Sequence, residues 1–373
     1  MRKVKILHIA QAGAGGVERF VRLLISNLDR SKFENYLICA EDYSADNYVN
    51  YVEEFIPLKM KRNLSFKDFL FILEIRKLIK RINPDIVYAH SSKAGVIARL
   101  ADIGLKNKII YNPHGWAFNM NGSRYKRLFY AFIEKVCSCL CDKIVCVSDS
   151  EKMSALKWHI CKDNKIKVIY NGIDVDDYKK RNYLSSKNDL KIPENSYVVG
   201  MVGRVAEQKA PEVFVETARI VKQKIDNAFF VIVGDGPLIE KIKELIERYK
   251  LTNCFLVTGW KEDPIEYARY FDVSCLLSRW EAFGLVLAEY MMIKSPIVAT
   301  NVDAIPNLIK DNENGLLICK DNYKEAADAI CKLHENANLV KQLTDHAYSD
   351  LLKRFDIKLV IKNHENLFSE LLL

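Results

Sequence analysis

Two glutamates stand eight positions apart in the segment SRWEAFGLVLAEYM, residues 278–291, with a Phe-Gly pair between them. Glu281 precedes Gly284, and Glu289 lies inside an otherwise apolar run. A charged side chain is rarely buried without a partner. Glu289 therefore either faces solvent or binds a partner group, and the predicted elements around it bear on this choice.

The position of these glutamates after a predicted strand favours a binding role. The run DVSCLL, residues 272–277, is typical of a buried strand. Ligands of open parallel sheets bind beyond the carboxyl ends of the strands. Gly284 and Leu285 open a helix there, whose free N–H groups and dipole attract an anion. Two carboxylates around such a helix start suit a nucleotide-sugar, because its hydroxyl pairs donate to carboxylates while its diphosphate takes the helix start.

Two cations follow the first predicted strand of the second half of the chain, in MVGRVAEQKAPEVF. Arg204 and Lys209 are five residues apart, and Pro211 suits the start of a helix. Such a pair fits a diphosphate, and two solvated surface cations are the alternative. Gly234 and Gly236 follow the next strand, where glycine either lets a ligand approach closely or simply makes a turn.

A glycine-rich loop follows the first predicted strand, in QAGAGGVERF. Gly13, Gly15 and Gly16 stand before a helix, where backbone N–H groups can meet an anion, although a plain turn is the alternative. The dinucleotide fingerprint G-x-G-x-x-G fails, because its last glycine would fall at Glu18. An NAD-dependent dehydrogenase is therefore disfavoured.

Short strand-like runs alternate with amphipathic helical stretches along the chain, which predicts parallel, doubly wound sheets. The alternation stops in the polar stretch 174–196 and restarts with YVVGMVG at 197–203. Two Rossmann-like domains in tandem are expected from this break. The expected boundaries are residues 1–175 for the first domain, 176–196 for a linker, 197–355 for the second domain, and 356–373 for a C-terminal helix that packs back towards the first domain.

The positive charge of the chain is concentrated in its first half. The net charge is +8, and residues 1–180 alone hold 31 Lys and Arg against 20 Asp and Glu. An anionic partner is expected, and without a nucleic-acid-binding signature a membrane surface or an anionic substrate is favoured over nucleic acid. The basic amphipathic stretches 58–82 and 120–132 could lie on an anionic bilayer, whereas core helices with a solvated charged face are the alternative.

Four of the ten cysteines crowd the segment CSCLCDKIVC, residues 137–146. A zinc site is one hypothesis, but the spacing is not Cys-x-x-Cys and no histidine pair is nearby. Buried thiols of a protein in a reducing compartment are favoured. No run approaches about 18 uncharged apolar residues, so no transmembrane helix is expected.

Several of these segments together resemble the family 4 retaining glycosyltransferases of the GT-B fold. Glu281 and Glu289 match the E-x7-E motif of that family, and the likeness covers nearly the whole chain. The resemblance implies two Rossmann-like domains that face each other across a cleft. The segments that carry it are GGVER (15–19), NGID (171–174), GRVAEQK (203–209), VGDGP (233–237) and SRWEAFGLVLAE (278–289).

The resemblance also implies a donor-binding role for each matching residue of the second domain. Glu289 would hold the ribose hydroxyls, and Glu281 would contact the donor sugar. Arg204 and Lys209 would neutralise the diphosphate leaving group. Further contacts to the donor would come from Gly234, Phe283, Gly284 and Leu285.

Residues of the first domain would complete the site by the same resemblance. Gly15 and Gly16 would approach the phosphate, and His114, in YNPHGWAF, would face the reacting centre. Two departures from the family pattern are Ala210 and Ala282, at positions where the family often has glycine. Both changes are small, and they should leave backbone contacts intact.

The expected reaction is transfer, with retention, of a hexose or an N-acetylhexosamine from a nucleotide-sugar, with a UDP-sugar favoured. The basic half suggests a lipid-linked saccharide acceptor, as in capsule, exopolysaccharide or lipopolysaccharide assembly, and Ser91, Ser92 and Lys93 could touch it. Neither a divalent metal nor another cofactor is expected, because Arg204 and Lys209 already supply the charge of a metal. The expected location is cytoplasmic and peripheral on the inner face of the membrane.

Two other functions stay open. A nucleotide-sugar 2-epimerase shares the two-domain architecture without needing an acceptor. A non-catalytic partner that binds a nucleotide-sugar for another transferase is the second alternative, although the set of charged site residues argues against it.

Overall fold

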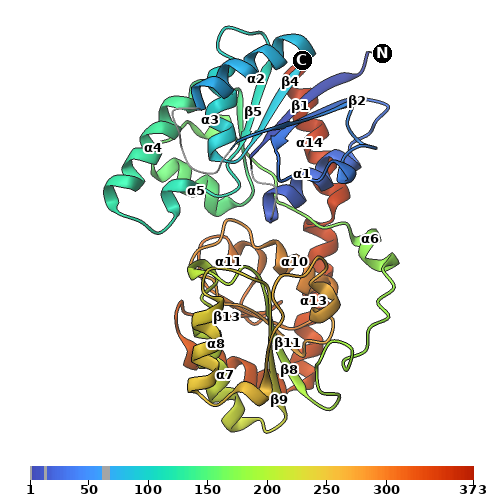
Figure 1. Cartoon of the computed structure of the whole chain (residues 1–373), viewed down its shortest axis with the longest axis vertical. Coiled ribbons are helices and arrows are strands. Elements are labelled where there is room, and N and C mark those ends of the chain that lie inside the picture. Colours follow the sequence, from blue (N-terminus) through green and yellow to red (C-terminus); the bar gives the residue numbers. More distant parts are fainter. Residues whose placement is uncertain (1, 12–14, 61–67) are drawn as a thin grey trace. The chain divides into compact units, whose positions relative to one another are not determined.

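The computed structural model describes residues 2–11, 15–60 and 68–373. The chain divides into two units, each with its own sheet and helices (Figure 1). The first unit comprises Met1–Asp174 together with Ile357–Leu373, and the second comprises Val175–Asp356. Gly13 and the cations at positions 61 and 62 lie outside the described residues.

The first unit is built on a seven-stranded sheet whose order is β3-β2-β1-β4-β5-β6-β7, with all pairings parallel. The strand order reverses between β1 and β4, which is the kind of switch point where ligands of doubly wound sheets bind. The central strands are buried on both faces, as near-continuous apolar runs predict. The strands are β1 (Val4–Ala10), β2 (Phe33–Ala40), β3 (Glu54–Leu58), β4 (Ile86–His90), β5 (Lys108–Asn112), β6 (Lys143–Cys146) and β7 (Ile166–Val168).

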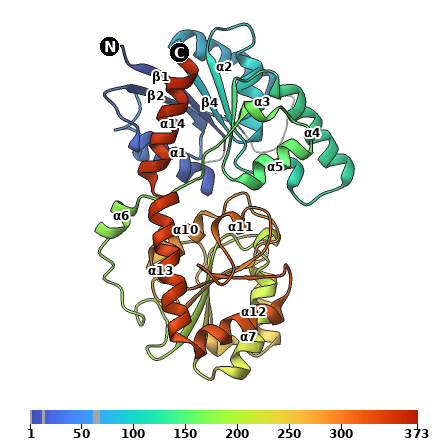
Figure 2. The same cartoon turned by 180° about the vertical axis from the view of Figure 1, so that it is seen from behind.

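Helices cover both faces of this sheet, and each face has its own apolar core. On one face, α1 (Gly16–Asn27) packs beside α14 (Ile357–Leu372), the last helix of the chain (Figure 2). Phe368 of α14 meets Phe33 of β2 edge to face, so the C-terminal helix completes the core of the first unit. The other face is covered by α2 (Asp68–Ile82), α3 (Ser92–Ala101), α4 (Arg124–Ser138) and α5 (Asp149–Lys157).

The second unit has a six-stranded sheet in the order β10-β9-β8-β11-β12-β13, again with parallel pairings. Both units therefore confirm the predicted Rossmann-like, doubly wound architecture. The strands are β8 (Tyr197–Val202), β9 (Ala228–Val233), β10 (Phe255–Val257), β11 (Val273–Leu276), β12 (Ile297–Thr300) and β13 (Leu316–Ile318). The helices are α6 (Val175–Lys180), α7 (Pro211–Lys224), α8 (Ile239–Arg248), α9 (Ile265–Ala268), α10 (Leu285–Met292), α11 (Ile305–Leu308), α12 (Tyr323–Glu335) and α13 (Ala337–Arg354).

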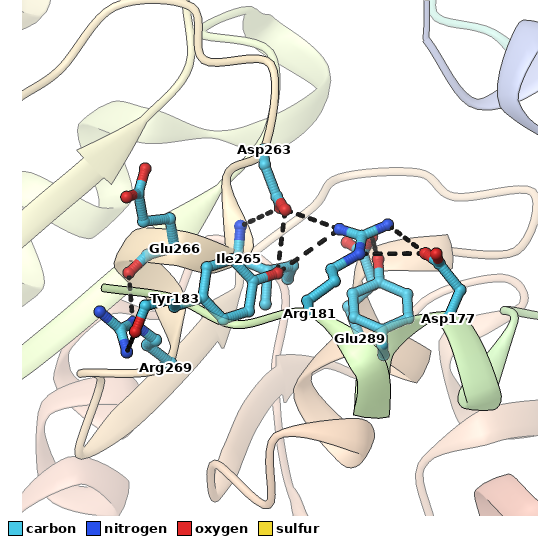
Figure 3. A network of polar contacts seen from close by, with 9 residues as sticks. Asp177, Arg181, Tyr183, Asp263, Ile265, Glu266, Arg269 and Glu289 are labelled. Atoms are coloured by element: carbon cyan, nitrogen blue, oxygen red, sulfur yellow. Dashed lines mark hydrogen bonds and ion pairs between the residues drawn. The ribbon is translucent and has the colours of Figure 1, made fainter. Parts of the chain in front are cut away.

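The segment 176–196 is not an independent linker, because it is bound to the second unit. It begins within α6, and Arg181 next to that helix donates to Asp263 over 2.6 Å. The Tyr183 hydroxyl donates to the same carboxylate over 2.9 Å (Figure 3). The expectation of a linker rested on the missing apolar period, but ion pairs and hydrogen bonds attach this segment instead of an apolar face.

Two strands of the structure are not predicted by the sequence pattern, and both lie at sheet edges. β3 contains Pro57, which lacks an N–H group and is tolerated in a strand mainly at an edge. β13 is only three residues long. Short edge strands carry little alternation, so the sequence pattern underestimates the width of both sheets.

Candidate active site

An ion pair joins two predicted site residues at the carboxyl end of the second sheet. The Lys209 ammonium, from the turn Glu207–Lys209 that follows β8, contacts a carboxylate oxygen of Glu281, which follows β11. The side chains are 15% and 10% exposed, so both remain in reach of a ligand. The Ser278 hydroxyl donates to the same Glu281 oxygen over 3.2 Å. The ammonium of Lys209 is thus fixed at the carboxyl ends of the strands, where parallel sheets bind their ligands and where an anionic ligand is expected.

The structure adds Asp303 to this group, a residue that the sequence interpretation missed. Asp303 follows β12, and its carboxylate accepts the Glu281 backbone N–H over 3.1 Å. Burial raises the pKa of Asp303, and the negative charge of Glu281 raises it further. The hydrogen bond from the Glu281 backbone N–H acts in the opposite direction. The strand-end rule could have found this residue, because it follows a buried strand of the same sheet.

Arg279 ties the two charged loops together. Its backbone N–H donates to the Gln208 carbonyl over 2.8 Å, and its guanidinium donates to the Glu207 carbonyl over 3.1 Å. The same guanidinium bonds the carboxylates of Glu212 and Asp321, each over 2.7 Å. These contacts hold the loop that carries Lys209 beside the loop that carries Glu281.

Glu289 is buried and holds a hydroxyl group. It lies in α10 and is only 2% exposed, so its side chain does not face solvent. The Tyr178 hydroxyl of α6 donates to its Oε1 over 2.7 Å. The Arg181 guanidinium lies over the Tyr178 ring at 4.2 Å, and Arg181 also pairs with Asp177 (Figure 3). This carboxylate therefore already accepts one hydroxyl within the chain.

The start of α10 presents N–H groups beside the ion pair. Gly284 adopts the left-handed conformation (φ 83°, ψ 60°) as the residue before the helix, and N–H groups of a first helical turn lack intrahelical acceptors. Leu285 begins the helix and is half-buried, whereas Phe283 is buried. Arg204 is exposed and has no side-chain hydrogen bond or ion pair within the part of the chain that the structure describes.

Backbone geometry explains the residue types found at Ala210 and Gly234. Ala210 adopts φ 48° and ψ 52°, so it keeps the left-handed conformation that glycine takes more readily. A Cβ atom on Gly234 would lie 2.0 Å from the Gly203 carbonyl oxygen. Gly234 is therefore needed for close packing of its loop on the loop of Arg204, which is a structural reason independent of any ligand.

His114 lies at the carboxyl end of β5 in the first unit. It is half-buried, has a positive φ of 50°, and its backbone N–H donates to the Asn112 side chain over 3.0 Å. One ring nitrogen lies 3.2 Å from His90. Burial, and next the nearby His364, lower the pKa of His114 to about 3. This imidazole is neutral at physiological pH, which rules it out as a cation for the diphosphate.

The other predicted residues of the first unit gather at neighbouring strand ends. Gly15 and Gly16 are exposed at the start of α1, and an added Cβ on either would meet no atom within 4 Å. Ser91 follows β4, and its buried hydroxyl has no hydrogen-bond partner among the described residues. Ser92 begins α3, and Lys93 is only 8% exposed. Gly15 and Gly16 are thus uncovered by the described residues, whereas Lys93 is not freely presented.

The cysteine segment 137–146 shows mostly buried thiols. Cys137, Cys141 and Cys146 are buried and Cys139 is exposed. Within residues 2–11, 15–60 and 68–373, no group of three or more His, Cys, Asp or Glu side chains could hold a metal ion.

Comparisons with known proteins identify the family of the chain. The family model described as Glycosyltransferase Family 4 matches residues 14–177, and the model described as Glycosyl transferases group 1 matches residues 184–350. The two matches together leave only short stretches of the chain uncovered.

Individual proteins resemble the chain over most of its length. An uncharacterized 41.2 kDa protein in the cps region of Klebsiella pneumoniae is 30% identical over 335 residues, 88% of each chain. The UDP-Gal:alpha-D-GlcNAc-diphosphoundecaprenol alpha-1,3-galactosyltransferase of Escherichia coli is 29% identical and covers 90% of this chain and 89% of its own. The crystal structure of Anabaena HepE in complex with UDP-glucose shares the fold, with a TM-score of 0.82 and 20% identity over 98% of this chain and 100% of HepE. The chain therefore belongs to the family 4 glycosyltransferases of the GT-B fold.

Proposed function

We propose that the chain transfers a hexose or an N-acetylhexosamine, with retention of the anomeric configuration, from a UDP-sugar to a lipid-linked saccharide. The observation that carries the proposal is the Lys209–Glu281 ion pair beside the start of α10, with Glu289 holding a hydroxyl eight residues further on. A cation beside a helix start suits a diphosphate. A buried carboxylate that accepts the Tyr178 hydroxyl suits a ribose hydroxyl.

The names of relatives support the choice of donor and acceptor. The relative from Escherichia coli is named for transfer from UDP-Gal to a saccharide on diphosphoundecaprenol, and HepE was crystallised with UDP-glucose. The Klebsiella relative comes from a cps region. We extend to this chain a UDP-sugar donor, an acceptor linked to a lipid diphosphate, and a role in the assembly of a surface polysaccharide.

In the proposed reaction, the bond between the anomeric carbon and the diphosphate oxygen breaks. The acceptor hydroxyl oxygen forms the new bond on the same face of the sugar, and the departing diphosphate takes the hydroxyl proton. Lys209 and Arg204 stabilise the negative charge that develops on the diphosphate. Glu281 keeps the ammonium of Lys209 in position and offers a carboxylate to the sugar hydroxyls.

A transfer assay tests this proposal. UDP-Gal, UDP-Glc, UDP-GalNAc and UDP-GlcNAc are each incubated with GlcNAc-diphosphoundecaprenol, and the product is identified by mass and by its anomeric proton coupling. An α-linked product from an α-linked donor supports the proposal, and a β-linked product contradicts retention. A 2-epimerase would instead convert one donor to its C2 epimer without acceptor, and a binding partner would form no product from any donor.

Metal independence is a separate prediction. Arg204 and Lys209 supply the positive charge that a divalent ion would bring to the diphosphate, so transfer in excess EDTA is expected to match transfer without it. The measurement is the initial rate with EDTA and then with added Mg²⁺ or Mn²⁺. A rate that EDTA abolishes and Mg²⁺ restores would show that the two cations do not suffice.

The exposed face of α4 supports docking on an anionic membrane. Tyr125, Phe129 and Phe132 are 84%, 55% and 64% exposed, and the cations Arg124 and Lys135 lie on the same helix. Exposed aromatic side chains interleaved with cations are typical of helices that lie in the interface of an anionic bilayer. None of the helices described in the chain is both long and apolar enough to cross a membrane.

The variant Phe129→Ser with Phe132→Ser is expected to abolish flotation with phosphatidylglycerol vesicles, because it removes apolar area that the interface would bury. Charge reversal of Lys77 and Lys80 on α2 should weaken flotation as well. Trp260→Ser is the matched control, since Trp260 is 71% exposed but lies in the second unit. Wild-type protein that never floats, or that floats equally on phosphatidylcholine, would contradict an anionic docking surface.

A further inference from the structure

One asparagine and three histidines form a hydrogen-bonded row across four neighbouring strands of the first sheet. Asn35 of β2 contacts His8 of β1, with 3.2 Å between Asn35 Oδ1 and His8 Nε2. His8 Nδ1 lies 3.2 Å from His90 Nε2 at the end of β4. His90 Nδ1 lies 3.2 Å from His114 Nε2, just after β5. The row therefore begins in the buried core and ends at a predicted site residue.

The row is buried at its inner end and uncharged. Asn35, His8 and His90 are at most 2% exposed, and the Phe20 ring of α1 packs edge-on to the His114 ring with 4.8 Å between centroids. Burial lowers the pKa of His8 to about 4 and that of His114 to about 3. Burial also lowers the pKa of His90 well below its usual range. Each imidazole is thus neutral, with one N–H group and one nitrogen lone pair.

These neutral rings constrain one another. An amide oxygen can only accept, so with Asn35 Oδ1 facing His8 the proton of His8 lies on Nε2 and its Nδ1 accepts. His90 must then donate from Nε2 and accept at Nδ1, and His114 must donate from Nε2. The group left over is a lone pair on His114 Nδ1, which has no hydrogen-bond partner within the described parts of the chain.

We propose that Asn35, His8 and His90 are positioning residues that fix the tautomer of His114, so that its Nδ1 accepts a hydrogen bond from a hydroxyl of the sugar substrate. This inference rests on the proposed function. With this tautomer, His114 Nδ1 can bind only a hydrogen-bond donor such as a hydroxyl group. A carboxylate or phosphate oxygen is excluded, because its lone pairs would face the lone pair of Nδ1. Because the row ends at an amide oxygen, it sets orientation and does not carry protons to solvent. The proton of the acceptor hydroxyl accordingly goes to the departing diphosphate.

The tautomer can be measured without any substrate. The full chain is labelled with ¹⁵N-histidine, and the ring signals of His114 are assigned by their loss in His114→Ala. The expected result at neutral pH is a pyridine-type signal for His114 Nδ1 and a pyrrole-type signal for Nε2. The reversed pair of signals would overturn the inference, because it would mean that the Asn35 amide nitrogen faces His8 and that every hydrogen bond in the row points the other way.

Matched variants of His8 separate positioning from packing. In His8→Asn, the side-chain oxygen can replace Nδ1 as the acceptor for His90, so the tautomer of His114 and the transfer rate should be retained. In His8→Phe, the ring stays but the acceptor is lost, so the His114 signals should become those of mixed tautomers. The rate constant kcat should fall in proportion to the lost fraction of the competent tautomer, by about twofold to tenfold, the range that one hydrogen bond supplies. KM for the donor should stay unchanged. Equal tautomer signals in both variants would overturn the inference.

Failure of this inference differs visibly from failure of the proposed function. Reversed His114 signals in a chain that transfers sugar would remove the positioning role and leave the transferase standing. If His114 gave the expected signals but the chain transferred no sugar, the row would still fix the tautomer. Its partner could then not be a hydroxyl of the sugar substrate, and the proposal as stated would be overturned.

Discussion

Replacement of Lys209 by methionine is expected to lower kcat about 10²-fold to 10³-fold, the usual cost of removing one group that stabilises transition-state charge. Lys209 is held by Glu281 and is 15% exposed, so its charge is fixed before the diphosphate leaves. A preorganised charge costs no reorganisation at the moment of reaction. The measurement is the initial transfer rate at saturating UDP-sugar, and the effect on the donor KM should be smaller than the effect on kcat.

Two controls distinguish lost catalysis from lost stability. Lys209→Arg keeps the positive charge and should recover part of the rate. Lys243→Met removes an exposed lysine of the same unit, whose partner is Glu240, and should leave the rate unchanged. Because Lys209→Met also leaves Glu281 without its cation, urea unfolding of each variant has to accompany the kinetics. A folded Lys209→Met protein with normal kcat would refute the assigned role.

Substitution of Glu289 by glutamine is expected to weaken the binding of UDP about 10-fold to 100-fold, since hydrogen bonds to a charged group contribute about 1.5–3 kcal/mol. The carboxylate is 2% exposed and accepts the Tyr178 hydroxyl over 2.7 Å. Glutamine keeps one acceptor oxygen and the shape of the side chain, but it loses the charge. Titration calorimetry with UDP measures the effect without any acceptor.

Tyr178→Phe serves as the companion variant. It removes the hydroxyl that Glu289 holds but leaves the carboxylate, so the loss of UDP affinity should be smaller than in Glu289→Gln. If UDP bound equally well to wild type and to folded Glu289→Gln, the ribose would have to be held by other groups.

Much of the proposed donor site can be located from the sequence because strand ends are easy to locate. A buried apolar run such as residues 272–277 marks the strand, and the next polar residues, Ser278 and Glu281, then lie at the carboxyl edge of the sheet. The spacing from Gly284 to Glu289 places the second glutamate inside a helix. Local patterns of this kind specify which residues share an edge, but they do not predict the Lys209–Glu281 ion pair, which depends on how the two loops pack.

Contacts that depend on tertiary packing leave no trace in the sequence pattern. Tyr178 lies in a polar stretch more than one hundred residues before Glu289, and nothing in its neighbours indicates that it meets this carboxylate. His8 and His90 interrupt apolar strands, where a lone histidine is more often structural than functional. Only the order of the strands in the sheet brings them into one row with His114. Long-range pairing of polar groups, unlike apolar periodicity, is fixed by the fold alone.

The measurement that tests the central claim most directly is release of nucleotide from UDP-, GDP- and dTDP-sugars, with membrane lipid extract present or absent. The wild-type chain is predicted to release nucleotide from a UDP-sugar only when the extract is present. Lys209→Met is predicted to bind the same donor and release little. No release from any donor in the presence of the extract, with tight binding of one of them, would contradict the assignment as a transferase.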